Sequence, residues 1–123
     1  MSDEMERREY PRARADLSLK IETGAVVESK VRNISCSGIH CQIRCSVQLM
    51  SKVVIALLLP SLAGKKSGNF DKIDCEGVVV RIQKVAERDE ILYNTAVFFT
   101  NLDKKDKEKI AHFVEHKLFE QER

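Results

Sequence analysis

The sequence predicts a mainly β fold, either a small antiparallel barrel or a sandwich, with one helix at its C-terminal end. Two observations support this prediction. Short alternating or apolar segments follow one another with only turns between them, and no helical segments separate them as they would in a parallel sheet. Near residue 103 the apolar residues change to helical spacing. A chain of 123 residues is expected to form a single domain.

Five or six strands are expected in chain order. Leu17 to Ile21 alternates apolar and polar residues, which is typical of a strand with one buried face. Val53 to Leu59 is apolar throughout, so we expect a central strand buried on both faces. Gly77 is expected at a bend or bulge of a later strand. The remaining expected strands are Val26 to Ile34, Ile39 to Ile43, Ile73 to Val85 and Leu92 to Phe99.

The C-terminal segment predicts one amphipathic helix that packs against an opening of the barrel. Asn101 or Asp103 is expected to cap its N-terminus. His112 and His116 are four residues apart on this helix, and we expect them to be surface residues rather than metal ligands, because no further ligand is clearly placed to join them. The apolar face of the helix consists of Ile110, Phe113, Val114 and Leu118.

The charge balance argues against a protein that coats DNA or RNA. The chain carries 21 basic and 19 acidic residues, a net charge of +2, which is too small to neutralise a nucleic-acid backbone over a wide surface. No apolar run reaches the roughly 18 residues that a membrane span needs, and the N-terminus lacks the apolar region of a signal peptide. We therefore expect a soluble cytoplasmic protein without membrane insertion, whose four cysteines remain ordinary thiols.

Polar residues interrupt the strand pattern between Val31 and Ile43. Asn33, Ser35 and Ser37 can hydrogen-bond neighbouring backbone groups in a bend. Gly38 can take a positive φ or let a ligand approach the backbone closely. The sequence therefore predicts a polar turn, residues 33–38, on a sheet whose other face is buried.

An arginine-rich segment precedes the first strand, and 20 residues separate it from Asn33. It reads Arg7-Arg8-Glu9-Tyr10-Pro11-Arg12. Pro11 favours extended backbone before it, and in extended chain Arg8 and Arg12 project to the same side. Together with the polar turn, these arginines could hold an anionic, planar ligand that forms hydrogen bonds. The alternative is a solvated, charged terminus.

Catalysis and metal binding are weaker interpretations. An enzyme could use Ser35, Cys36 or Cys41 as nucleophile with His40 as base. Because His40 and Cys41 are adjacent on a strand, their side chains point to opposite faces and cannot act as such a pair. We therefore expect no catalytic residues. A zinc site from Cys36, His40, Cys41 and Cys45 has suitable ligand types but irregular spacing, so no metal and no cofactor are expected.

Read together, the arginine segment and the polar turn resemble the signature of the PilZ domain family. That signature is RxxxR, matched by Arg8 and Arg12, followed at about this separation by (D/N)xSxxG, matched by Asn33, Ser35 and Gly38. The resemblance covers roughly residues 6–118. It includes the segments Val53 to Pro60, Gly77 to Arg81 and Ala96 to Phe99.

The resemblance implies a six-stranded antiparallel β-barrel that binds the bacterial second messenger cyclic di-GMP. Arg8 and Arg12 would contact phosphate and the guanine Hoogsteen edge or face, with Arg7 as a third cation. Asn33, Ser35 and the backbone at Gly38 would meet a guanine from below. Residues 1–6 carry no apolar periodicity, so we expect a flexible tail there. One domain is expected over 7–119, consisting of an arginine arm (7–14), a barrel (15–100) and a helix (103–120).

The resemblance implies that the signal passes to a downstream signalling or motility protein, in motility or biofilm regulation. Our hypothesis is that ligand binding orders the arm and so changes the surface that this partner reads. A monomer or weak dimer is expected. Two departures from the family pattern bear on affinity: Asn33 stands where Asp is commoner, and Ala96 where Gly is frequent. The alternative is a PilZ-like protein-interaction adaptor that does not bind nucleotide.

Overall fold

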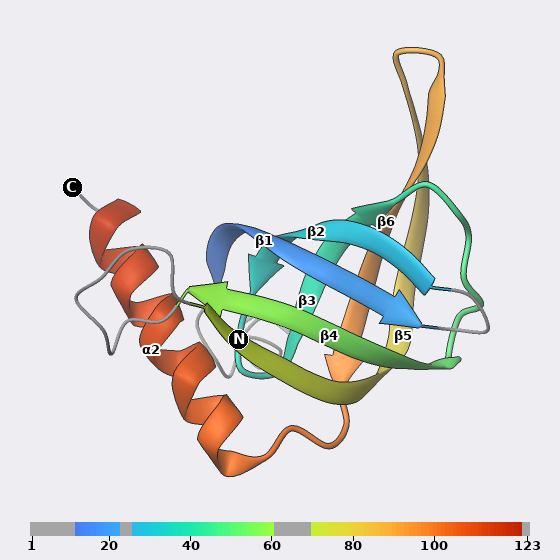
Figure 1. The fold of residues 1–123 in the computed structure, drawn as a ribbon. Coiled ribbons are helices and arrows are strands. Elements are labelled where there is room, and N and C mark those ends of the chain that lie inside the picture. The colour runs from blue at the N-terminus through green and yellow to red at the C-terminus, as the bar shows by residue number, and fades with distance from the viewer. Residues whose placement is uncertain (1–11, 23–25, 61–69, 122–123) are drawn as a thin grey trace, which may run out of the picture.

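A computed structural model describes residues 12–22, 26–60 and 70–121 of the chain. Within these three segments the chain forms six strands and one helix (Figure 1). The strands are β1 (Ala13–Glu22), β2 (Val26–Ile34), β3 (Gly38–Ile43), β4 (Lys52–Pro60), β5 (Phe70–Glu87) and β6 (Glu90–Phe99), and the helix is α2 (Lys104–Gln121). The predicted six strands and C-terminal helix are confirmed.

The six strands close into a barrel in the order β1-β2-β3-β6-β5-β4. All neighbours pair antiparallel, and β4 pairs with β1 to complete the wall. The predicted barrel is therefore correct, and the sandwich alternative is excluded. The β5–β6 hairpin continues well beyond the barrel wall (Figure 1). The barrel begins at Ala13, two residues before the predicted start at residue 15.

The prediction that Val53 to Leu59 is buried on both faces is wrong. In β4 the odd-numbered residues point into the barrel, whereas Val54 and Leu58 are 47% and 41% exposed. A strand in the wall of a closed barrel has only one inner face, so its side chains alternate between core and outer surface even when all are apolar. The four buried positions of β4 are Val53, Ile55, Leu57 and Leu59.

Helix α2 lies across the end of the barrel at which β1 begins and β4 ends (Figure 1). Its buried residues Ile110, Phe113 and Val114 join the barrel core, as the helical spacing predicted. Asp103 caps the helix, because its Oδ1 accepts a hydrogen bond from the backbone N–H of Asp106 at 2.8 Å. No helix in the described segments is long and apolar enough to cross a bilayer.

Asn101, the other predicted cap, has a different role. Its side-chain oxygen accepts a hydrogen bond from the backbone N–H of Glu76 at 2.5 Å, and its amide nitrogen donates to Glu76 Oε1 at 3.1 Å. These bonds tie the segment after β6 to β5. The helix starts one residue after the predicted position 103 and ends one residue after the predicted position 120.

The two-residue turn of the β5–β6 hairpin gives a stability prediction. Arg88 and Asp89 have φ angles of 49° and 64°, which are unfavourable for residues with a Cβ and favour Asn-Gly. We expect the double variant Arg88→Asn, Asp89→Gly to raise the free energy of unfolding by about 1 kcal/mol, the relief of left-handed strain less the added glycine entropy. Urea unfolding measures the change.

A matched control places Asn at Lys84, an exposed position on the same hairpin whose backbone is already extended. No gain in unfolding free energy is expected there, because Asn removes no strain and is a poor strand former. A double variant that unfolds at a lower urea concentration than the parent chain would contradict the assignment of strain to this turn.

Candidate functional site

The polar turn joins β2 to β3 and is held together by its own hydrogen bonds. The backbone N–H of Ser35 donates to the carbonyl of Gly38 at 3.0 Å. The backbone N–H of Ser37 donates to Ser35 Oγ at 3.1 Å, and the two hydroxyl oxygens are 2.9 Å apart. Ser35 is only 2% exposed. Its hydroxyl therefore fixes the shape of the turn and presents little surface to a ligand.

Gly38 is required by the close approach of two strands. A Cβ on Gly38 would overlap the carbonyl oxygen of Val97 and would lie 3.2 Å from the carbonyl carbon of Val97 and 3.3 Å from the Cα of Phe98. Its φ is not in the left-handed region. The positive φ that the sequence suggested is therefore absent. The structure adds a further reason for glycine: a side chain at residue 38 would push β3 away from β6, with which it pairs here.

Shifts in strand register lie beside the turn. One shift in β1 lies between Arg14 and Leu17, and one in β2 lies before Asn33. A further shift in β5 lies between Val79 and Arg81. The sequence placed a bend or bulge at Gly77; the strand register is continuous there, and the bulge occurs a few residues later. Bulges re-aim side chains in barrel walls.

These registers bring five residues into line across the outer face of the barrel, and we call them the transverse row. Asn33 pairs with Arg14 of β1 on one side and with His40 of β3 on the other. His40 pairs with Ala96 of β6, and Ala96 pairs with Arg81 of β5. The row thus has an arginine at each end and small, polar or aromatic side chains between them.

The outward direction of the centre of the row follows from burial. His40 lies between the buried Ile39 and Cys41, and Ala96 lies between the buried Thr95 and Val97. Since side chains alternate along a strand, His40 and Ala96 face outward. The Ala96 methyl therefore lies beside the imidazole on the outer surface and does not crowd the core.

Arg12 is exposed and lies two residues before Arg14, the β1 member of the row, and Arg81 forms the opposite end of the row. The pKa of His40 is lowered from its ordinary value by burial first, and then by the positive charges of Arg12 and Arg81. Since Arg12 comes from the N-terminal segment and Arg81 from β5, two distant parts of the chain place positive charge on the same patch of the barrel. Such a patch favours an anion.

The structure brings together some of the predicted site residues. Exposed Arg12 and half-buried Asn33 lie on the outer face near His40. Ser35 and Gly38 form the turn and the strand contact beneath them. Arg7 and Arg8, and with them the tail and most of the arm, lie outside the described residues.

The sequence analysis missed His40 as a surface residue of the site, and it missed Arg14 and Arg81 altogether. His40 could have been found, since alternation from the predicted strand Ile39 to Ile43 already places it on the outer face. Arg14 and Arg81 depend on registers that contain bulges, and the sequence carries no local signal for those.

The nucleophile interpretation finds no support in the geometry. Cys41 is buried, and burial raises its pKa to about 12. Cys36 donates a hydrogen bond from Sγ to the carbonyl of Lys107 at 3.6 Å. In the part of the chain that the structure describes, no cluster of three His, Cys, Asp or Glu side chains could hold a metal ion. The three cysteines of the zinc-site interpretation thus lie in different environments: Cys36 is half-buried, Cys41 is buried and Cys45 is exposed.

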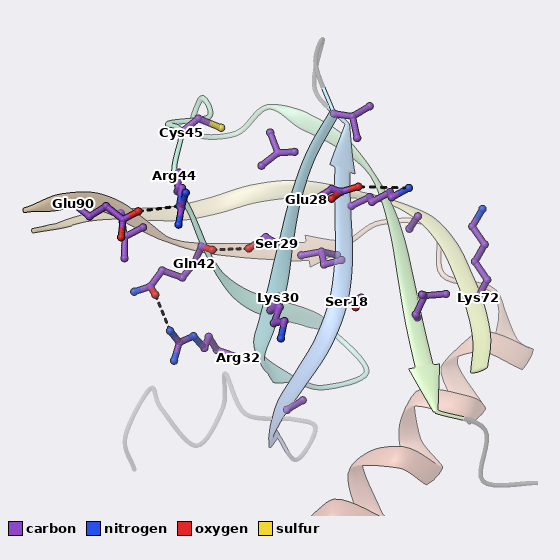
Figure 2. Close-up of a pocket in the computed structure, with 18 residues that line it drawn as sticks. Ser18, Glu28, Ser29, Lys30, Arg32, Gln42, Arg44, Cys45, Lys72 and Glu90 are labelled. Carbon is purple, nitrogen blue, oxygen red and sulfur yellow. Dashed lines mark hydrogen bonds and ion pairs between the residues drawn. The ribbon is translucent and has the colours of Figure 1, made fainter. Parts of the chain in front are cut away.

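A second surface feature is an open groove of about 1380 Å³ on the outer face of the barrel, lined mainly by β1 and β2 with contributions from the other four strands (Figure 2). Its basic side chains are largely engaged: Arg44 Nε lies 3.0 Å from Glu90 Oε1, and Arg32 donates to Gln42 Oε1 at 2.8 Å. The groove includes Arg32, the neighbour of Asn33, but not Asn33 itself. The groove and the transverse row are therefore adjacent but distinct surfaces.

The fold and site define a small closed β-barrel with a cationic patch beside a Ser-rich turn. The model of the PilZ domain family matches residues 6–116, so the chain belongs to the PilZ domain family. No curated protein matches the chain by sequence.

Solved structures show the same fold. Inhibitor of motility MotI from Bacillus subtilis is 20% identical with a TM-score of 0.81, and the match covers 95% of this chain and 54% of that one. The PilZ domain of YcgR from Escherichia coli, solved with c-di-GMP, is 12% identical with a TM-score of 0.68 and 94% of each chain covered. The K. pneumonia MrkH–c-di-GMP complex is 16% identical with a TM-score of 0.73, covering 95% of this chain and 54% of MrkH. The chain thus spans about half the length of MotI and MrkH.

The tight contact at Gly38 predicts that Gly38→Ala destabilises the barrel. Because the new methyl must push β3 away from the backbone of Val97, we expect a loss of about 1–3 kcal/mol in the free energy of unfolding. Urea denaturation gives the value. Ser37→Ala is the control, since it removes only a hydroxyl contact and should cost about 1 kcal/mol or less. Equal stability of Gly38→Ala and the parent chain would show that the strands can separate without penalty.

Thiol labelling tests the separate environments of the cysteines. At about pH 7.5 the exposed Cys45 should be alkylated first, because reaction needs an accessible thiolate. Cys41 and Cys75 should react only on unfolding, since burial raises their pKa values to about 12 and about 11. Peptide mapping by mass spectrometry follows each site. Rapid alkylation of Cys41 in the folded protein would mean that the barrel opens readily at β3.

Proposed function

We propose that this PilZ domain is a receptor for cyclic di-GMP and not an enzyme. The observation that carries the proposal is the placement of Asn33 in the transverse row, with Arg12 and Arg81 near His40. Family membership and the c-di-GMP in the related YcgR and MrkH structures also favour it.

The chemistry of these groups suits this ligand. A guanidinium group can form paired hydrogen bonds with phosphate oxygens or with guanine O6 and N7, and its plane can stack on a base. In the proposal, Arg7, Arg8 and Arg12 supply these contacts. The Asn33 side chain offers both an acceptor and a donor to a guanine edge. The net charge of the chain is only +2, so there is no broad positive field to attract the ligand. The arginines must therefore bind through the placement of their hydrogen bonds as well as through their charge.

Ser35 and Gly38 have supporting roles at the site. The Ser35 hydroxyl is engaged by Ser37 within the turn, and Gly38 allows β3 to approach β6. Both therefore determine where Asn33 and His40 stand. Their contribution to affinity comes through the shape of the surface beneath the base, together with the backbone at Gly38.

We further propose that ligand binding draws the arm onto the barrel and so alters a surface read by a downstream signalling or motility protein in the cytoplasm. The polar turn is also connected to the C-terminal helix, because Cys36 donates a hydrogen bond to the carbonyl of Lys107 in α2. A change at the turn on ligand binding could therefore reach the surface of the helix. Ordering a segment on binding is a common way to create a new recognition surface.

The alternative function is a protein-interaction adaptor that does not bind nucleotide. The burial of Ser35 favours it, since a serine of the signature is then closed off from a ligand. The receptor and the adaptor differ in one measurable property, the affinity of the purified chain for cyclic di-GMP.

Isothermal titration of the intact chain with cyclic di-GMP tests the proposal. We expect binding by the parent chain, and in Arg8→Ala or Arg12→Ala a loss of about 2–5 kcal/mol, which is more than tenfold in affinity. This is the usual effect of removing one member of a desolvated charge pair. Asn33→Ala should weaken binding less, because it removes neutral hydrogen bonds.

Arg44→Ala is the matched control, because Arg44 is an exposed arginine of the groove in Figure 2 that is paired with Glu90. Its affinity should equal that of the parent chain. If Arg44→Ala loses affinity while Arg12→Ala does not, the ligand lies in the groove and the site assignment is wrong. If the parent chain does not bind cyclic di-GMP but still captures a signalling protein, the adaptor function replaces the receptor.

A further inference from the structure

His40 occupies the centre of the transverse row, between Asn33 and Ala96 on the neighbouring strands. Its side chain is half-buried on the outer face, and Ala96 beside it is too small to cover the imidazole. Within the described residues, no hydrogen bond engages the His40 ring. An uncommitted imidazole therefore stands where a ligand on Asn33 would lie.

Among the described side chains, the charged groups in and beside the row are basic. Arg12 precedes β1, Arg81 comes from β5, and Arg32 precedes Asn33 on β2 and donates to Gln42. Arg14, at the β1 end of the row, is engaged by contacts of its own. None of the five residues of the row is acidic. Burial and the charges of Arg12 and Arg81 lower the pKa of His40, so in the free protein the imidazole is neutral near pH 7.

We propose that His40 lies beneath a phosphate of the bound dinucleotide and takes up a proton from solvent when the ligand binds, so that affinity rises as the pH falls. This inference rests on the proposed function. A phosphodiester remains anionic over this range and would lie among Arg12, Arg81 and the ring. Its charge would offset the repulsion between the arginines and imidazolium, and an imidazolium N–H can donate a charge-assisted hydrogen bond to phosphate oxygen.

The direction of the effect follows from linkage. In the free protein the pKa of His40 is below its ordinary value, and in the complex the phosphate raises it. Affinity is therefore lowest above the pKa of the complex, and it increases as the pH falls toward the pKa of the free protein. Below that second pKa, which is under the ordinary 6.5, affinity becomes constant because both states carry the proton. Each unit of difference between the two pKa values strengthens binding by up to about tenfold.

The arginines cannot produce this dependence, because guanidinium stays charged throughout the range. A neutral His40 that only stacks on guanine or accepts a hydrogen bond would also leave affinity independent of pH or weaken it in acid. A pH slope of the proposed sign therefore distinguishes proton uptake at His40 from both of these arrangements.

The experiment is a calorimetric titration of the full chain with cyclic di-GMP between about pH 5.5 and about pH 8, at constant ionic strength and in two buffers of different ionisation enthalpy. We expect tighter binding at the lower pH and net uptake of less than one proton per ligand site at intermediate pH. His40→Gln should match the parent chain most closely at the highest pH and should lose the slope. His116→Gln on α2 is the control, because His116 lies beside Glu120 away from the row, and its slope should equal that of the parent chain.

The ring proton resonances of His40 in the parent chain give a measurement that does not depend on a variant. Their titration should show a higher pKa with cyclic di-GMP than without it. Binding with a flat pH profile, an unchanged His40 titration or a slope retained by His40→Gln would overturn the inference and leave the receptor function intact. Absence of binding by the parent chain at every pH would overturn the receptor function and this inference together.

Discussion

The close approach of β3 to β6 at Gly38 is the contact on which the geometry of the site depends. The backbone of Val97 occupies the space where a side chain at residue 38 would be. The backbone N–H of Phe99 also donates to the carbonyl of Ser37 at 2.9 Å, so the turn itself is anchored to β6. Because His40 lies two residues after Gly38, the same contact determines which residue of β6 stands beside the imidazole. The glycine of the signature thus positions the surface through strand pairing.

Barrel closure accounts for the convergence of residues that are distant in sequence. Each strand has two hydrogen-bonded neighbours, so a line drawn across the wall passes through β1, β2, β3, β6 and β5 in turn. Arg14, Asn33, His40, Ala96 and Arg81 lie on one such line. The buried face beneath it is almost entirely apolar, and a sheet with one buried apolar face has a strongly specified register. The core therefore serves the site by fixing the spacing of outward side chains.

Much of the fold could be predicted from the sequence, since alternation and the helical spacing at Ile110, Phe113 and Val114 are local signals. The error at Val53 to Leu59 arose because composition alone does not distinguish a strand buried on two faces from a barrel strand with apolar residues outside. Arg12 and Asn33 were predicted because they are motif positions. Arg81 was not predicted as a site residue. Its pairing with Ala96 depends on a bulge after Val79, and no local sequence pattern predicts that bulge.

A histidine among arginines has an energetic consequence for the free protein. Positive charges near His40 disfavour its protonated form, and the row supplies no carboxylate to compensate them. Stability alone would favour an acidic or neutral partner at such a place, as Glu90 provides for Arg44 in the groove. Basic groups without an acidic partner are concentrated at functional sites, because there the negative charge of the bound ligand compensates them. The arginines of the groove are engaged by Glu90 and Gln42, whereas Arg12 and Arg81 bring positive charge to His40 in the row. The row is therefore the stronger candidate for an anionic ligand.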